Sequence, residues 1–108
     1  LIPSITSHGV QEATSLSMLE GMACGKIVIC SSIGSMREML QDDVTGYLVS
    51  ERNPEEIAGK INSILKGSVD IESMGRRARE YVVEHHSYIP HAVLIRNVYE
   101  TACPVNQE

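Results

Sequence analysis

The chain has 108 residues, enough for one domain, and 43% of them are hydrophobic, with no apolar run long enough to cross a membrane. Its formal net charge is −5, and its basic residues gather only at Arg76, Arg77 and Arg79, which argues against a nucleic acid as the main partner. We therefore expect a soluble, globular protein without a signal peptide or a transmembrane helix.

The chain begins with a strand-like segment. Leu1 and Ile2 predict the end of a parallel strand, and Pro3 ends that strand in a loop running to Gln11. Such a start is typical of a piece cut from a longer protein. Because ligands in open α/β sheets lie beyond the carboxyl ends of the strands, this loop borders the candidate site. His8 in the loop either contacts a ligand phosphate or is simply solvated.

A short, largely buried helix is predicted from Leu16 to Cys24, directly after the loop. Ser15 is a good N-cap residue, apolar side chains follow at helical spacing, and Gly25 stands in the usual C′ position. Glu20 carries the one charge of this helix. Because a buried lone carboxylate is costly, we expect Glu20 to face a cleft or to hold a partner.

The start of this helix is a candidate anion site. Backbone N–H groups near Ser15 to Ser17 have no partner within the helix, and the positive end of the helix dipole lies beside them, which suits a phosphate. Glu12 precedes the helix and Glu20 lies within it, so two carboxylates flank the site. Glu12 would also fit an ordinary solvated loop acid.

Strands and helices alternate along the rest of the chain. A strand from Lys26 to Cys30, covered on both faces, precedes a short helix from Met36 to Leu40 and a strand from Tyr47 to Val49. Three further helices begin after the N-cap residues Asn53, Asp70 and Ser87, and the last runs to about Thr101, before a loose tail. The sequence thus predicts an α/β fold: half of a doubly wound parallel-sheet domain, followed by C-terminal helices.

The remaining polar clusters have ordinary explanations. The arginines at 76, 77 and 79 could bind phosphate, but such runs usually form a solvated helix face. Two metal ligands on one helix need a spacing of three or four residues, so the adjacent His85 and His86 make a poor metal site. We expect no protein-bound metal.

Cysteine usage points to a reducing compartment. Cys24, Cys30 and Cys103 form no CxxC pair and no metal-binding spacing, and the first two fall in segments that look buried. They fit reduced core thiols of a cytoplasmic protein.

Five linked segments resemble a known family. They are Pro3 with Ser4, the pair Glu12 and Glu20 with seven residues between, the run from Gly21 to Ile29, Gly34 to Glu38, and Thr45 to Val49. In this order they look like the C-terminal, nucleotide-sugar-binding part of retaining GT-B glycosyltransferases, the glycosyl transferases group 1, with their E-x7-E motif. The family often has Gly-Phe-Gly where this chain has Ala13 to Ser15, and a second glycine where it has Ser35. These departures bear on the donor sugar more than on the fold.

The resemblance implies a function for each acid of the motif. Glu12 would hold hydroxyls of the donor sugar and support its reacting face, and Glu20 would accept hydrogen bonds from the ribose. Backbone N–H groups of the segment Thr14, Ser15, Leu16 and Ser17 would bind sugar and phosphate. The segment from Gly34 to Glu38 would lie near the nucleotide, although Glu38 equally fits the preference for an acid in a first helical turn.

The resemblance also defines the expected partners. Residues 1–108 would be part of the C-terminal domain, and the acceptor domain and an upstream phosphate-neutralising Lys/Arg pair would lie outside them. The parent would transfer a hexose, with retention, from a nucleotide diphosphate sugar to a hydroxyl of a glycan, lipid or small molecule, with no cofactor. Peripheral membrane association, or an oligomer through an open sheet edge, would be compatible with it. The piece alone would be inactive.

Two other functions remain open. The same half-fold could serve as a non-catalytic binding or interaction module, or belong to a GT-B nucleotide-sugar epimerase, because fold alone does not separate these. The sequence upstream of Leu1 would discriminate them: a Lys/Arg pair and a second Rossmann-like domain would favour the transferase.

Overall fold

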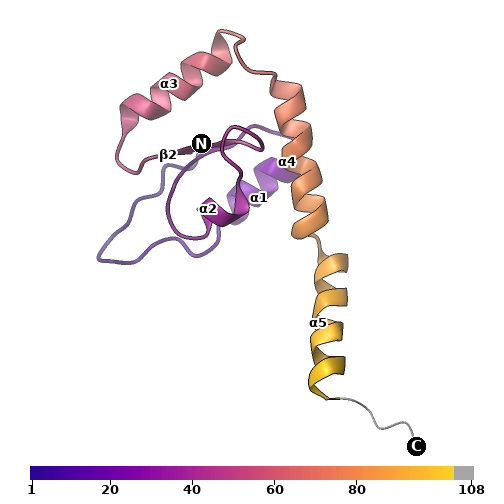
Figure 1. The fold of residues 1–108 in the computed structure, drawn as a ribbon. Helices are drawn as coiled ribbons and strands as arrows, with labels where there is room; N and C mark the ends of the chain where they lie inside the picture. Colours follow the sequence, from indigo (N-terminus) through magenta and orange to yellow (C-terminus); the bar gives the residue numbers. More distant parts are fainter. Residues whose placement is uncertain (104–108) are drawn as a thin grey trace, which may run out of the picture.

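The computed structural model describes residues 1–103, so the predicted loose tail lies mostly outside the described part. Helices and strands alternate as the sequence predicts and then give way to three helices in succession (Figure 1). In chain order the elements are α1 (Leu16–Ala23), β1 (Ile29–Ser31), α2 (Met36–Met39), β2 (Tyr47–Val49), α3 (Pro54–Leu65), α4 (Ile71–His85) and α5 (Tyr88–Ala102).

The sheet is parallel. β1 and β2 pair in register from Ile29 opposite Tyr47 to Ser31 opposite Val49. Ile2 adds a single parallel bridge to Cys30 on the other side of β1, where its N–H donates to the Ile29 carbonyl at 2.8 Å. The strand predicted at residues 26–30 lies instead at residues 29–31, because its partner β2 begins only opposite Ile29. All three extended segments run in one direction, so their carboxyl ends lie at one edge.

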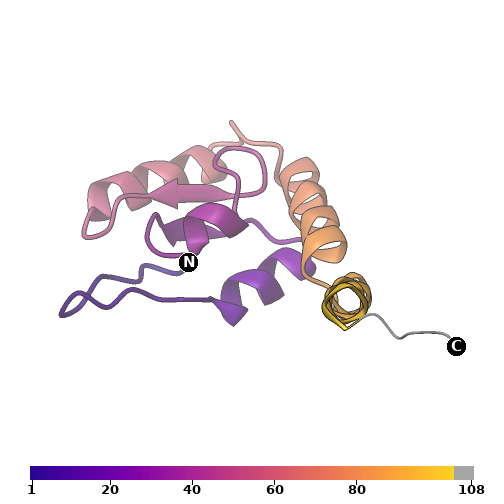
Figure 2. The ribbon, with the colours of Figure 1, turned by 60° about the horizontal axis from the view of Figure 1, so that its bottom comes forward.

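The two faces of the sheet pack against different helices. Alternation along β1 sends Cys30 to one face, where it joins Met18 and Met22 of α1, and sends Ile29 to the other. On that second face, aliphatic side chains of α3 cover Ile29, Tyr47 and Val49. Figure 2 shows α3 and α1 on opposite sides of the strands. A strand buried on both faces was predicted, and burial of all three β1 residues confirms it.

Helix α1 is capped as predicted but is less buried than expected. The Met18 N–H donates to Ser15 Oγ at 3.2 Å, and Gly25 ends the helix with a φ of +68°. Only Met18 and Met22, four residues apart, form its fully buried stripe. Leu16 is 68% exposed, and Cys24, predicted to be buried, is exposed. A helix of eight residues packed along one stripe leaves the other positions open.

Helix α4 packs against α1. Gly75 allows this approach, because a Cβ atom there would lie 2.0 Å from the Gly25 carbonyl oxygen. The three arginines at 76, 77 and 79 are exposed, as expected of a solvated helix face, and two of them also bond to neighbouring elements. Arg77 Nε donates to the Val44 carbonyl at 2.8 Å, and Arg79 donates to the Ala23 carbonyl at the end of α1. These two arginines fasten α4 to neighbouring elements.

Helix α5 follows α4 end to end and extends away from the rest of the molecule (Figure 1). None of its residues is buried. Ser87 was predicted to cap α5 with its side chain, but its hydroxyl donates back to the Val83 carbonyl at 2.7 Å. Within residues 1–103, no helix combines the length and the apolar character needed to span a bilayer.

Candidate functional site

The loop between Ile2 and α1 contains a small hairpin. The Ser7 N–H donates to the Val10 carbonyl and the Val10 N–H to the Ser7 carbonyl, at 3.1 and 2.8 Å. His8 and Gly9 form the turn with φ values of +50° and +76°, the signs required by a two-residue type I′ turn. This local structure places His8 at an exposed tip, where its Nδ1 contacts the Ser7 hydroxyl at 3.1 Å.

The loop after β1 holds the end of this first loop. The Gly34 N–H donates to Gln11 Oε1 at 3.1 Å, and the Ser35 hydroxyl donates to the Ala13 carbonyl. The backbones also meet closely, because a Cβ atom on Gly34 would lie 2.2 Å from the Glu12 carbonyl oxygen. With a φ of +53°, Gly34 adopts a conformation that other residues rarely take. The lack of a side chain at Gly34 therefore allows the Glu12 backbone to lie directly against it.

The turn after β2 holds the start of the first loop. Glu51 accepts hydrogen bonds from the Thr6 N–H at 2.6 Å and from the Thr6 hydroxyl at 3.2 Å, and Arg52 Nη2 donates to the Thr6 carbonyl at 3.2 Å. The Thr6 N–H is the largest cause of a lowered pKa at Glu51, because a bonded donor favours the charged carboxylate. Loops from all three strand ends are thus joined at one edge of the sheet.

Glu12 is held within this group of loops. Its carboxylate accepts a hydrogen bond from the Ser4 hydroxyl at 2.5 Å, and the residue is only partly exposed. A freely solvated loop acid would lack both features. Ser4 follows the first extended segment and Glu12 precedes α1, so the contact spans the base of the loop. The arrangement orients a charged acceptor beside the start of α1.

The predicted phosphate-binding segment, Thr14 to Ser17, leads through the N-cap Ser15 into the first turn of α1. Ser15 is buried and uses its hydroxyl for the helix cap, whereas Thr14, Leu16 and Ser17 are exposed. Within the described part of the chain, the N–H groups of Leu16 and Ser17 donate to no protein acceptor. These groups, with the helix dipole, can bind an anion. The buried Ser15 side chain contributes to this site by capping the helix.

Glu20 lies on the solvent side of α1. Met18 and Met22 face the core, and Glu20, two residues from each, points to the opposite side. The side chain is exposed and has no hydrogen-bond or ion-pair partner among residues 1–103. Of the two expected alternatives, a cleft or a partner, the described residues therefore provide no partner, and the side chain faces solvent. An exposed carboxylate is available to a ligand without a desolvation cost.

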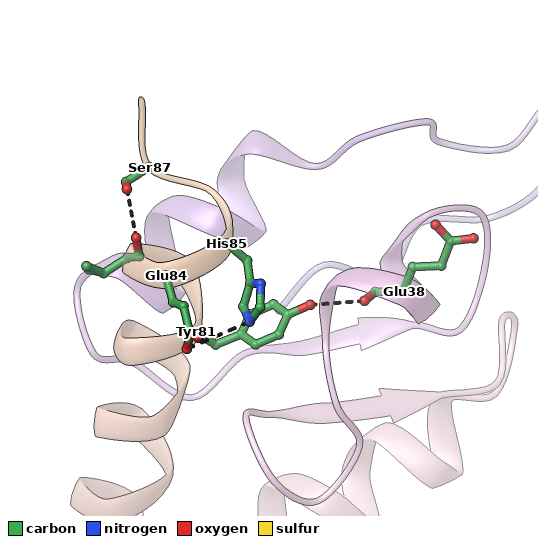
Figure 3. A network of polar contacts seen from close by, with 6 residues as sticks. Glu38, Tyr81, Glu84, His85 and Ser87 are labelled. Atoms are coloured by element: carbon green, nitrogen blue, oxygen red, sulfur yellow. Dashed lines mark hydrogen bonds and ion pairs between the residues drawn. The ribbon is translucent and has the colours of Figure 1, made fainter. Parts of the chain in front are cut away.

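Glu38, in helix α2, lies beside helix α4. Its carbonyl accepts a hydrogen bond from Tyr81 Oη at 3.3 Å, and its carboxylate points away from Tyr81 (Figure 3). Both histidines lie beside the same ring, with centroids 4.5 Å from Tyr81 for His85 and 5.7 Å for His86. Adjacent residues within a helix point to different faces, but α4 ends at His85, and both imidazoles lie against one ring. Desolvation is the main cause of a lowered pKa at His86.

No metal cluster marks the site among residues 1–103, and the cavity described below lies elsewhere. Among residues 1–103, no group of three or more His, Cys, Asp or Glu side chains is arranged to hold a metal ion. A cavity lined by Asn97, Val98, Thr101 and Ala102 lies on α5, away from the joined loops. The sequence motif, and not the cavity, locates the candidate site.

Sequence analysis missed the residues whose hydrogen bonds hold the loops together. Thr6, Gln11 and Glu51 carry no motif, and each has a polar side chain that fits a solvated loop equally well. The parallel topology was the one available signal, because it predicts that strand-end loops meet at one edge. Which side chains pair across those loops depends on their local conformations.

Comparison with known proteins identifies the family. Residues 1–81 match the family described as glycosyl transferases group 1. The chain belongs to this family. It is 32% identical over 93 residues to an uncharacterized glycosyltransferase of Methanocaldococcus jannaschii. This match covers 86% of this chain and 24% of that protein. It is 36% identical over 74 residues to the N-acetyl-alpha-D-glucosaminyl L-malate synthase of Bacillus anthracis, covering 68% and 19%. The chain thus spans a quarter or less of the length of these two relatives.

Solved structures confirm the predicted fold. Anabaena HepE in complex with UDP superimposes with a TM-score of 0.80 at 20% identity, covering 85% of this chain and 25% of that one. Sucrose-phosphate synthase from Thermosynechococcus elongatus gives a TM-score of 0.75 at 27% identity, covering 82% and 22%. The parallel sheet and the helices that follow it match the GT-B glycosyltransferase fold. This group 1 chain therefore has the α/β architecture that the sequence predicts.

Proposed function

We propose that these residues form the donor-binding part of an enzyme that transfers a hexose from a nucleotide diphosphate sugar to an acceptor hydroxyl, with retention of configuration. The observation that carries the proposal is the position of Glu12. Its carboxylate is oriented by Ser4 and its backbone lies directly against Gly34, near the unpaired N–H groups at the start of α1. A solvated loop acid would need neither restraint.

Each part of the donor has a complementary group. The N–H groups of Leu16 and Ser17 and the α1 dipole suit the negative diphosphate. The exposed Glu20 carboxylate suits ribose hydroxyls, which are hydrogen-bond donors. Glu12 would then accept hydrogen bonds from hydroxyls of the sugar. HepE is described in complex with UDP and, in a second structure, with UDP and glucose, which supports a donor of this class.

Charge stabilisation is the main contribution of this segment to the reaction. As the bond between sugar and diphosphate breaks, negative charge grows on the leaving group, and fixed N–H donors stabilise that charge without reorganising. Glu12 would keep the sugar aligned for attack by the acceptor hydroxyl. In this proposal the acceptor-binding domain and further phosphate-neutralising side chains lie outside residues 1–108.

Replacing Glu12 with alanine in the full-length enzyme tests the proposal. If Glu12 acts on the sugar, Glu12→Ala should lower turnover by about 100-fold, while the affinity for the free nucleoside diphosphate stays within about twofold. Steady-state transfer with saturating donor measures the first quantity, and calorimetry with the nucleoside diphosphate measures the second. Glu55→Ala, which removes an exposed acid at the start of α3, is the matched control.

The result also separates the other candidate functions. Unchanged turnover of Glu12→Ala with an unchanged melting temperature would reject the role of Glu12. A full-length protein that binds nucleotide sugars but transfers none to any acceptor would favour a binding module. Conversion of the free nucleotide sugar to an epimer would favour an epimerase.

A further inference from the structure

Three side chains connect the ends of two neighbouring strands through the loop that carries Glu12. The Gly34 N–H donates to Gln11 Oε1 at 3.1 Å, and Gln11 Nε2 donates to Thr6 Oγ1 at 3.3 Å. The Thr6 hydroxyl then donates to Glu51 Oε1 at 3.2 Å. We call Thr6, Gln11 and Glu51 the loop relay. It runs from the loop after β1 to the turn after β2.

The directions of these hydrogen bonds are mutually consistent. The Thr6 hydroxyl has one proton to give, which it donates to Glu51, and its lone pairs accept from Gln11. Gln11 uses its amide nitrogen as donor and its oxygen as acceptor. Because the relay ends on a carboxylate, its last bond is charge-assisted, and successive bonds polarise one another. The Thr6 N–H also donates to Glu51, at 2.6 Å, and so holds the Glu51 end of the relay in place.

Hydrogen bonds, more than apolar burial, hold this loop. Its two large apolar residues, Ile5 and Val10, are 48% and 70% exposed. The hairpin turn at His8 and Gly9 brings Thr6 and Gln11 opposite each other just beyond the Ser7 and Val10 pair. Gln11 directly precedes Glu12. A loosened relay would therefore release the backbone that aims the Glu12 carboxylate.

We propose that the loop relay positions Glu12 for sugar transfer, with Glu51 as its anchor. The proposal rests on the transferase function proposed above. Thr6, Gln11 and Glu51 are positioning residues, since they act on the donor sugar through Glu12 and do not touch the reacting atoms. The nucleotide half of the donor, held at α1, is outside their influence.

Substitution of Thr6 in the full-length enzyme tests the relay. Thr6→Val keeps the side-chain shape and the N–H bonded to Glu51 but removes the hydroxyl, whereas Thr6→Ser keeps the hydroxyl. The matched control is Thr101→Val on α5, which removes a threonine hydroxyl bonded to the Asn97 carbonyl at 2.8 Å. Two measurements are made: steady-state transfer, which gives kcat and donor KM, and hydrogen exchange of the Gly34 amide.

The expected result is a lower kcat with little change in donor KM. Thr6→Val should lower kcat about tenfold through misalignment of the sugar, with donor KM changed less than about twofold. Its Gly34 amide should exchange faster, while Thr6→Ser and Thr101→Val match the wild type in both measurements. Unchanged kcat in Thr6→Val would overturn the proposal. So would a Thr6→Ser variant as impaired as Thr6→Val, or a loss of kcat with an unchanged Gly34 exchange rate.

The exchange measurement separates this proposal from the proposed function. If the wild-type enzyme transferred no sugar, the transferase function would fail, and the proposed role in transfer would fail with it. Faster Gly34 exchange in Thr6→Val alone would then still support the relay as a restraint on the loop. Equal exchange in all variants would overturn that restraint as well.

Discussion

The first loop and helix α5 differ in a way that their compositions do not suggest. The loop from Pro3 to Ala13 is polar and irregular, yet hydrogen bonds join it to the loops after both strands. Helix α5 is regular and rich in aliphatic and aromatic side chains, yet it buries none of them among the described residues. Tyr88 and Tyr99, near its two ends, are 80% and 70% exposed.

This difference shows that regular secondary structure and structural integration are separate properties. A helix pairs the backbone groups of its interior by itself and can therefore extend away from the domain without leaving those groups unpaired. An irregular loop cannot do so, and each of its polar groups needs a partner or water. The loop is consequently the region where single substitutions should have the larger effect.

Gly34→Ala should break the integrated loop most severely. The added Cβ atom would meet the Glu12 carbonyl at 2.2 Å, and the φ of +53° is unfavourable for alanine. We expect a loss of about 3 kcal/mol in unfolding free energy, together with loss of transfer activity. Chemical denaturation of the full-length protein measures the first quantity. Gly59→Ala, in α3 with open space around its Cβ position, is the control and should be neutral or stabilising. A Gly34→Ala protein as stable as wild type would contradict the close approach.

Cys30 should make stability fall at alkaline pH. Burial raises the pKa of this thiol from 9.0 to about 11. The unfolded thiol loses its proton near pH 9 while the folded one keeps it, so this contribution is complete below pH 9 and is lost as pH rises through 11. Across that window, the unfolding free energy should fall by about 1.4 kcal/mol per pH unit.

Denaturation of Cys30→Ala at the same pH values provides the comparison, since its slope should be shallower. Exposed Cys24 and Cys103 should react with iodoacetamide in the native protein, whereas Cys30 should react only after unfolding. Rapid alkylation of native Cys30 would show that the core beneath the strand-end loops opens readily.

Glu20→Gln should weaken donor binding without disturbing the fold. The substitution keeps the size but replaces a charged acceptor with a weaker one, and hydrogen bonds to charged groups contribute about 1.5–3 kcal/mol. We expect donor KM to rise about tenfold with little change in melting temperature, because the side chain is exposed and has no partner in residues 1–103. Glu72→Gln on α4 is a matched exposed control. An unchanged donor KM would argue against the ribose contact.

Leu94→Ala in α5 should have the smallest effect. Leu94 is 60% exposed, so truncation removes little packing, and the unfolding free energy should change by less than about 0.5 kcal/mol. The same substitution at Leu40, which is 1% exposed, should cost about 2–5 kcal/mol. A cost above about 1 kcal/mol for Leu94→Ala in the full-length protein would show that α5 is covered there, and the contrast with the loop would disappear.

The sequence was informative about the site wherever local chemistry decides the structure. Ser15 caps α1, and Asn53 and Asp70 cap α3 and α4 as predicted, because each cap is a short-range hydrogen bond. Glu12 was identified through its motif. Its hydrogen bond to Ser4 was not, since the two residues are joined only when the intervening hairpin folds back.

What the sequence by itself determined is the order of helices and strands, the parallel α/β class and the family, because hydrophobic periodicity, capping residues and motif spacing are properties of neighbouring residues. Only the tertiary structure decided that Glu20 and Cys24 are exposed, that Arg77 and Arg79 bond to carbonyls of other elements, and that Thr6, Gln11 and Glu51 join the strand-end loops. These features depend on which segments meet in space. A polar side chain in a loop has the same local chemistry whether it bonds to water or to a residue 45 positions away, as Thr6 does with Glu51.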